Sequence, residues 1–235
     1  MRLKILLLWL ALLVAAPLAA AEDACTPDTP VGTVCQLAID ALHPTQPGIG
    51  LLQVEQDLAH LGKKPLAKLH KYMLKKRIPV VIGPDAGYYL VDGHHLTREL
   101  WTLGQREVPV VIEGRLENPA TFWPEMQAHH WAWLADQQGR PVRPETLPRR
   151  IQDLPDYPYR SLAGFAQRAG LFDKHDEVYF VEFAWARYLG ERLHWAPVTR
   201  ATLARRLREA SRLACQPDAA GLPGYPGRAC SQPQP

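Results

Sequence analysis

The stretch from Ile78 to Leu100, reading IPVVIGPDAGYYLVDGHHLTREL, constrains the fold of this chain more than any other segment. The run Pro79–Ile82 is rich in β-branched residues and is bounded by turn residues, so it predicts a strand. Gly83–Gly87 predicts a chain reversal, and Tyr88–Val91 predicts a second strand that completes a hairpin. A helix is expected directly afterwards, because leucines follow at helical spacing, at Leu96, Leu100 and Leu103.

A polar cluster, Asp92-Gly93-His94-His95, lies where the second strand should meet this helix. Asp92 is expected to cap the helix, since a carboxylate can accept a first-turn N–H, and Gly93 permits a sharp bend. A helix N-terminus favours an anion such as phosphate. A carboxylate with two imidazoles could transfer protons or hold a metal ion. A capped helix with two surface histidines is the alternative interpretation.

The first 21 residues predict a secretory signal peptide. Arg2 and Lys4 are its positive end, Ile5–Val14 is too short to span a membrane comfortably, and small residues precede a cleavage site after Ala21. Residues 22–235 would then be exported to a periplasmic or secreted location, with no stable membrane span. The formal charge of +3 falls to +1 once Arg2 and Lys4 are removed, which is not typical of a strongly nucleic-acid-binding protein.

The four cysteines lie near the two ends of the mature chain, at Cys25, Cys35, Cys215 and Cys230. An even number in an exported protein predicts structural disulfides, and three pairings are possible. We favour Cys25–Cys35 with Cys215–Cys230, because each bond would close one proline-rich end. No pair has CxxC spacing, so redox or zinc chemistry is not expected.

Residues 63–77 form the most basic segment, with lysines along one face of a predicted helix: Lys64, Lys68, Lys71 and Lys75. This face could contact the phosphates of a nucleic acid, although such a run is more often a solvated surface.

A further helix is expected from Asn118, with Pro119 in its first turn, through an aromatic-rich run to Leu134. Its aromatic residues are most simply core packing. On a helix, the adjacent His129 and His130 diverge by about 100° and make a poor metal pair, so we interpret them as surface or packing residues. In the later helix 178–193, Glu182 is expected to form an ion pair with Arg160.

Five sequence blocks carry a resemblance to a known family: HPTQPGIGLLQVE (His43–Glu55), Ile78–Leu100, FWPEM (Phe122–Met126), DLPDYPYRSLAG (Asp153–Gly164) and VEFAWARYL (Val181–Leu189). From about residue 42 to residue 193, the chain resembles the putative ParB-like nuclease family of the ParB/sulfiredoxin superfamily. The resemblance implies an α+β fold, with a small mixed sheet wrapped by helices. We divide the mature chain into an N-terminal segment 22–41, this domain at 42–195, a C-terminal helical extension at 196–215 and a tail at 216–235.

The resemblance also implies a pocket at the Asp-Gly-His-His turn. In the wider superfamily the matching turn and helix bind nucleotide phosphates in partition proteins, sulfiredoxins and free-serine kinases. The matching positions here are Asp92, His94 and His95 as catalytic residues, and Gly93, Arg98, Gln46 and Gly50 as phosphate- or nucleotide-binding residues. His94 stands where sulfiredoxins carry their reactive cysteine, so reduction of sulfinic acid is not expected. Chromosome partition is not expected either, because a helix-turn-helix is not recognisable and the chain is predicted to be exported.

Two functions follow from these observations. A metal-assisted nuclease or phosphodiesterase would hold magnesium or manganese at Asp92, use His94 or His95 as general acid or base, and steady the phosphate with Arg98. The alternative is a nucleotide- or phosphate-binding module related to kinases, which export disfavours because nucleotides are scarce outside the cytoplasm. A third interpretation is an exported binding protein that kept the fold without the chemistry. The oligomeric state is not predicted by the sequence.

Overall fold

The computed structural model describes residues 23–174 and 179–227, so the predicted signal peptide lies outside the described residues. Five strands form one mixed sheet in the order β1-β5-β3-β4-β2. They are β1 (Val34–Ala38), β2 (Leu42–His43), β3 (Ile78–Ile82), β4 (Tyr88–Leu90) and β5 (Glu107–Arg115). The pairs β1–β5 and β3–β4 are antiparallel, whereas β3–β5 and β2–β4 are parallel. The α+β class, the mixed sheet and the β3–β4 hairpin are therefore as predicted.

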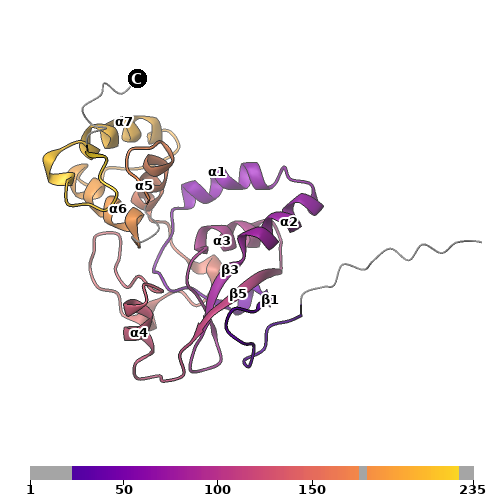
Figure 1. Ribbon diagram of the computed structural model, residues 1–235. Coiled ribbons are helices and arrows are strands. Elements are labelled where there is room, and N and C mark those ends of the chain that lie inside the picture. The colour runs from indigo at the N-terminus through magenta and orange to yellow at the C-terminus, as the bar shows by residue number, and fades with distance from the viewer. Residues whose placement is uncertain (1–22, 175–178, 228–235) are drawn as a thin grey trace, which may run out of the picture.

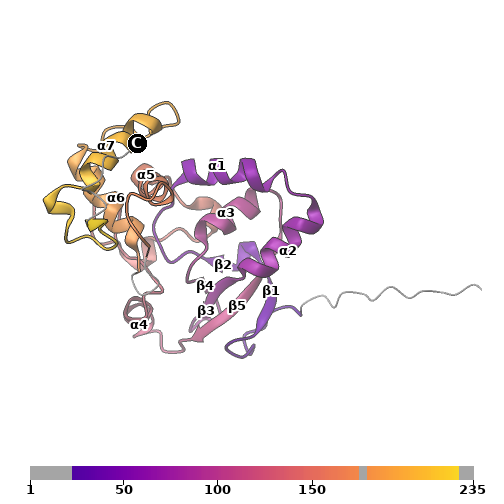
Figure 2. The ribbon, with the colours of Figure 1, turned by 45° about the horizontal axis from the view of Figure 1, so that its top comes forward.

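Three helices cover one face of this sheet: α1 (Leu51–Leu61), α2 (Leu66–Lys76) and α3 (His94–Thr102) (Figures 1 and 2). Strand side chains alternate between faces, so Val80 and Ile82 join the core beneath these helices, together with Leu100 of α3. Val81 joins a separate cluster on the opposite face. None of the helices in residues 23–174 and 179–227 is long and apolar enough to cross a membrane.

The opposite cluster includes residues of α4 (Phe122–Ala128), which is shorter than the helix expected from Asn118 to Leu134. The chain leaves the helix because Trp131 packs against β5. A Cβ on Gly114 would stand 2.7 Å from the indole ring of Trp131, so only glycine leaves room for this contact. His130 adopts a φ of 58° at the turn that brings Trp131 to the sheet.

A second hydrophobic core joins the last three helices, α5 (Pro158–Arg168), α6 (Val181–Arg192) and α7 (Leu203–Ala214). The stacked rings of Phe172 and Trp185, with centroids 4.4 Å apart, lie within it. The helix predicted at the C-terminal end, present as α7, packs into this core. Helix α5 also contacts α1, so the two cores lie side by side (Figure 2), and His95 of the Asp-Gly-His-His turn accepts the N–H of Gly50, which packs against α5.

One of the predicted disulfides is present: Cys25 and Cys35 are bonded, with their Cα atoms 5.1 Å apart. Cys35 is buried in β1, so the bond ties the N-terminal segment to the edge of the sheet. The predicted Cys215–Cys230 pair includes Cys230, which lies outside the described residues.

Candidate functional site

The turn that starts α3 differs from the predicted cap. Gly93 is the N-cap residue and has a φ of 83°, a left-handed conformation that favours glycine. The Asp92 carboxylate does not cap the helix. Its Oδ1 accepts the N–H of Gly93 at 2.6 Å, one residue before the helix, and the side chain is exposed. Asp92 is therefore open to solvent beside the helix start.

Both histidines of the turn hold the loop that precedes α1. His94 Nε2 accepts the backbone N–H of Thr45 at 3.1 Å, and His95 Nε2 accepts that of Gly50 at 3.0 Å. Burial lowers the pKa of His94, which is 4% exposed, to about 4, and lowers the pKa of His95 well below its usual range. Both rings are therefore neutral at pH 7, with the proton on Nδ1 and Nε2 acting as acceptor.

Two predicted binding residues, Gly50 and Gln46, lie on this loop, but only Gln46 lines a pocket. Gly50 packs against α5, where a Cβ would stand 2.5 Å from the Oγ of Ser161 and 2.7 Å from its backbone nitrogen. Gly50 therefore has a packing role. Gln46 lines a pocket beside the turn, and its Nε2 donates to the carbonyl of Gly48 at 3.1 Å.

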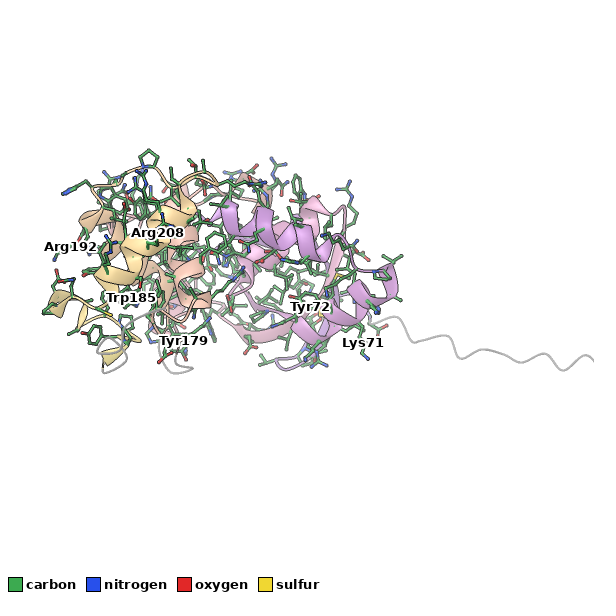
Figure 3. All side chains as sticks on the ribbon, turned by 90° about the horizontal axis from the view of Figure 1, so that it is seen from above. Lys71, Tyr72, Tyr179, Trp185, Arg192 and Arg208 are labelled. Atoms are coloured by element: carbon green, nitrogen blue, oxygen red, sulfur yellow. A yellow bond between two sulfur atoms is a disulfide. The ribbon has the colours of Figure 1, made fainter. Side chains whose placement is uncertain are left out.

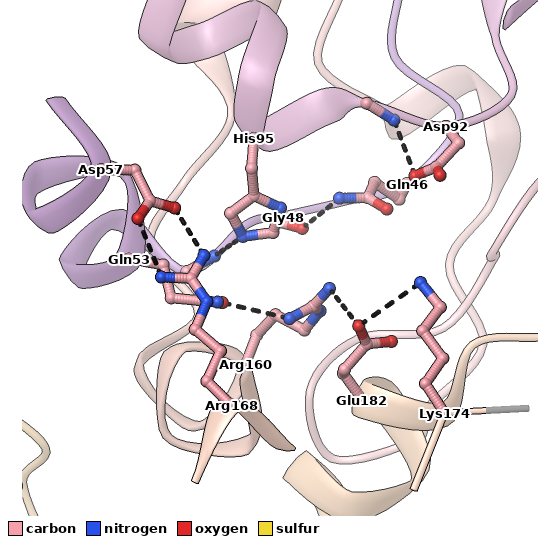
Figure 4. A network of polar contacts seen from close by, with 12 residues as sticks. Gln46, Gly48, Gln53, Asp57, Asp92, His95, Arg160, Arg168, Lys174 and Glu182 are labelled. Atoms are coloured by element: carbon pink, nitrogen blue, oxygen red, sulfur yellow. Dashed lines mark hydrogen bonds and ion pairs between the residues drawn. The ribbon is translucent and has the colours of Figure 1, made fainter. Parts of the chain in front are cut away.

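This pocket has a volume of about 360 Å³ and lies between the turn, α5, α6 and the segment after α4. One side, which we call the polar wall, consists of Gln46, Asp92, Arg160, Lys174 and Glu182. Figure 4 shows Gln46 and Asp92 on one side of the opening, facing Arg160, Lys174 and Glu182. The sequence prediction of a pocket at the Asp-Gly-His-His turn thus has a counterpart, with Asp92 at its rim and Arg160 opposite.

Arg160 is largely buried in the polar wall, with 12% of its side chain exposed. Its Nη1 donates to Oε1 of Gln53 at 3.2 Å, and its Nη2 lies 3.6 Å from Oε1 of Glu182, which is the predicted ion pair. Its Nε is buried without a hydrogen-bond partner among the described residues. Lys174 Nζ lies 3.9 Å from the same Glu182 oxygen, so two cations share one carboxylate (Figure 4).

The other side of the pocket, which we call the aromatic wall, consists of ring-bearing residues: His129, His130, Trp131, Tyr179, Phe180 and Phe183. His129 stacks on Trp131 with ring centroids 4.4 Å apart, and His130 stacks on Tyr179 at 4.3 Å. Sequence reasoning missed this wall because it placed both histidines on a helix. The run of two histidines and two tryptophans after FWPEM was the available signal.

Other predicted binding residues lie outside the pocket. The Nη1 of Arg98 donates to the backbone carbonyls of Ile151 and Gln152, at 3.2 and 2.7 Å, so Arg98 anchors the segment before α5 instead of facing a ligand. The predicted nucleic-acid-binding lysines are exposed on the α2 segment: Lys64, Lys68, Lys71 and Lys75. Figure 3 shows Lys71 at the other end of the molecule from Tyr179.

The pocket does not provide a ligand set for magnesium or manganese. Among the described residues, no group of three or more His, Cys, Asp and Glu side chains is placed to hold a metal ion. Of the two carboxylates in the polar wall, Glu182 is already bound to two cations. Asp92 alone would be a poor site for an ion that prefers several oxygen ligands. The donors of the pocket fit an anion better than a cation.

Comparison with known proteins places this geometry in a family. The family model described as putative ParB-like nuclease matches residues 35–191, which include every residue of both walls. The chain belongs to this ParB-like family. A similar solved structure is that of protein Atu1540 from Agrobacterium tumefaciens, with 31% identity and a TM-score of 0.72. The match covers 82% of this ParB-like chain and 96% of that one, whereas a comparison with curated proteins finds no match.

Proposed function

We propose that this ParB-like protein binds a phosphodiester in the pocket between the polar and aromatic walls. The observation that carries this proposal is the pairing of two cations, Arg160 and Lys174, with the single carboxylate of Glu182. The second carboxylate of the polar wall, Asp92, lies on the opposite side of the opening, so two cations and one carboxylate are grouped at this end of the pocket (Figure 4). Both cations line the pocket, so a phosphate bound there would accept a charge-assisted hydrogen bond from the Lys174 ammonium and lie beside the Arg160 guanidinium.

Cleavage of the bound phosphodiester is the second candidate function, and two observations favour it. The family description names a nuclease, and Asp92 places an exposed carboxylate in the same pocket. In this proposal a water molecule attacks phosphorus, its proton passes to Asp92, and the P–O bond to the leaving group breaks while solvent protonates the leaving oxygen. Arg160 and Lys174 would stabilise the charge on the phosphoryl oxygens. His94 and His95 would act indirectly, by positioning the loop that carries Gln46.

Export to an oxidising compartment is part of the proposal. The N-terminal sequence predicts a cleaved signal, and the Cys25–Cys35 bond is of the kind that persists outside the cytoplasm. A hydrolase would need no nucleotide supply there.

Binding can be tested by fluorescence anisotropy with a labelled single-stranded oligonucleotide, using protein expressed from the full sequence. Lys174→Gln should weaken binding about tenfold, the scale of one charge-assisted hydrogen bond. Lys71→Gln, which removes the same charge from α2, is the matched control and should bind like the wild type. Equal affinity in both variants would refute the assignment of the phosphate to this pocket.

Cleavage is tested separately, because binding and hydrolysis use different side chains. Asp92→Asn should retain binding and lose cleavage of DNA or RNA strands, with or without a chelator present. If the wild type cuts neither polymer at enzyme excess, the second candidate fails and phosphodiester binding remains. If Asp92→Asn cuts as fast as the wild type, Asp92 is not the base.

A further inference from the structure

The aromatic wall has no role in binding a phosphate, yet its rings remain open to a ligand. Tyr179 is 54% exposed, which is unusual among the large hydrophobic residues described, and it lines the pocket. The rings of His130 and Tyr179 are nearly parallel, with an interplanar angle of 13°, and both side chains are exposed. A flat, partly solvated ring pair at the mouth of a pocket can be extended by a third flat ring.

The two walls together match a ligand with two unlike ends. The polar wall offers two cationic side chains side by side, Arg160 and Lys174, which share the carboxylate of Glu182, and the aromatic wall offers ring faces. The volume of about 360 Å³ is in the lower part of the range of small-ligand sites. A nucleotide unit combines a phosphate with a flat base at this scale, whereas inorganic phosphate or a simple phosphodiester would leave the aromatic wall bare.

We infer that the pocket takes one nucleotide of a single-stranded nucleic acid, with its base stacked on the aromatic wall and its phosphate at Arg160 and Lys174. This inference rests on the proposed phosphodiester binding and adds the substrate class. A base inside a duplex is stacked between its neighbours and cannot also lie against Tyr179 or Trp131. An unpaired base has both faces free, and stacking on aromatic side chains is the usual way in which proteins hold single strands.

Two residues of the aromatic wall lie at helix ends in left-handed backbone conformations. His130 and Phe180 have φ values of 58° and 55°, which are costly for residues with a side chain. Both residues line the pocket, one on the segment after α4 and the other at the N-cap of α6. The turns at these two helix ends therefore place both rings in the wall.

The test uses three fluorescent probes: a thymidylate hexamer, an abasic hexamer with the same number of phosphates, and a stable hairpin that carries the six thymidylates in its duplex stem. The wild type should bind the thymidylate strand about tenfold more tightly than either other probe. Tyr179→Leu should remove most of that preference without changing binding of the abasic strand. Lys174→Gln should weaken the two single strands by equal factors. Leu66→Ala, at an exposed apolar position on α2, is the control and should bind like the wild type.

The outcomes separate this inference from the function on which it rests. If the abasic and thymidylate strands bind equally and Lys174→Gln weakens both, phosphodiester binding stands and base stacking is wrong. If no probe binds, the proposed function fails as well. Tighter binding of free thymidine monophosphate than of any strand would overturn the assignment to a polymer. Stronger binding of the duplex than of the single strand would overturn the inference that the bound base is unpaired.

Discussion

Protonation of His94 should destabilise the folded protein. The size of the effect depends on how far burial lowers the pKa of the His94 ring. Nε2 of His94 accepts the N–H of Thr45. In a protonated ring Nε2 would itself carry a proton, so the N–H of His94 and the N–H of Thr45 would point at each other. Burial lowers the pKa of His94 from 6.5 to about 4, although the nearby Asp92 carboxylate acts in the opposite direction. The folded protein therefore resists the proton that the unfolded chain takes up readily.

The sign and size of the effect follow from this difference. Above about pH 7 the ring is neutral in both states, so the free energy of unfolding is unaffected. Below pH 6.5 the unfolded chain binds the proton first, and stability falls by about 1.4 kcal/mol for each pH unit. The loss is about 2 kcal/mol at pH 5 and on the order of 3 kcal/mol near pH 4.

A second buried group works against this trend. Burial, reinforced by the charge of Asp57, raises the pKa of Glu99 to about 8. The folded protein therefore binds a proton at Glu99 before the unfolded chain does, and this term increases stability as the pH falls from 8. The total pH profile mixes these two groups with His95, whose pKa burial also lowers, so the His94 term must be measured as a difference between two proteins.

The comparison is between the wild type and His94→Gln, whose amide oxygen can still accept the N–H of Thr45 but does not titrate. Urea unfolding followed by tryptophan fluorescence, without a reducing agent, gives the free energy of unfolding at pH 7 and pH 5. Between these values the wild type should lose about 2 kcal/mol more than the variant, because every other titrating group is common to both. Equal losses in the two proteins would refute the reasoning.

Three further changes test the packing and charge assignments. Glu99→Gln should raise the free energy of unfolding by about 2–3 kcal/mol at pH 7 and by little at pH 4.5, measured by urea unfolding, because the amide needs no proton to be buried. Gly50→Ala should cost about 1–3 kcal/mol and lower the melting temperature, since its Cβ would collide with α5, whereas Gly221→Ala has open space and should not. Replacing Cys25 and Cys35 together by serine should cost about 2–4 kcal/mol, and no change in the urea midpoint would contradict a stabilising bond.

Prediction from the sequence succeeded where the signal is short-range. The hairpin of β3 and β4 follows from a β-branched run, a reversal and a second run, and it is present with the expected pairing. The start of α3 after Gly93 follows from the leucine spacing. The Cys25–Cys35 bond joins residues near each other in the chain, and the Arg160–Glu182 pair was expected because a carboxylate among aromatic residues needs a partner.

Prediction was wrong where a local rule competed with a distant contact. Asp92 has the right chemistry for a cap, but Gly93 takes the cap position with a left-handed backbone. The helix expected to reach Leu134 ends at Ala128, because Trp131 packs against β5. The Nε2 atoms of His94 and His95 accept backbone N–H groups from the loop before α1. That loop lies more than forty residues before the turn in the sequence.

The sequence by itself determined the class of fold, the order of the elements and the position of the Asp-Gly-His-His turn, since these depend on patterns within a few residues. Only the tertiary structure decided what surrounds that turn. Packing of α5 against α1, and of α6 against α5, places Arg160 and Glu182 opposite Asp92, and the early end of α4 places the segment that carries His129, His130 and Trp131 in the aromatic wall. The side chains that line this pocket are spread through the sequence from Gln46 to Phe183. A periodic pattern within one helix or strand cannot predict which of these distant residues meet in the fold.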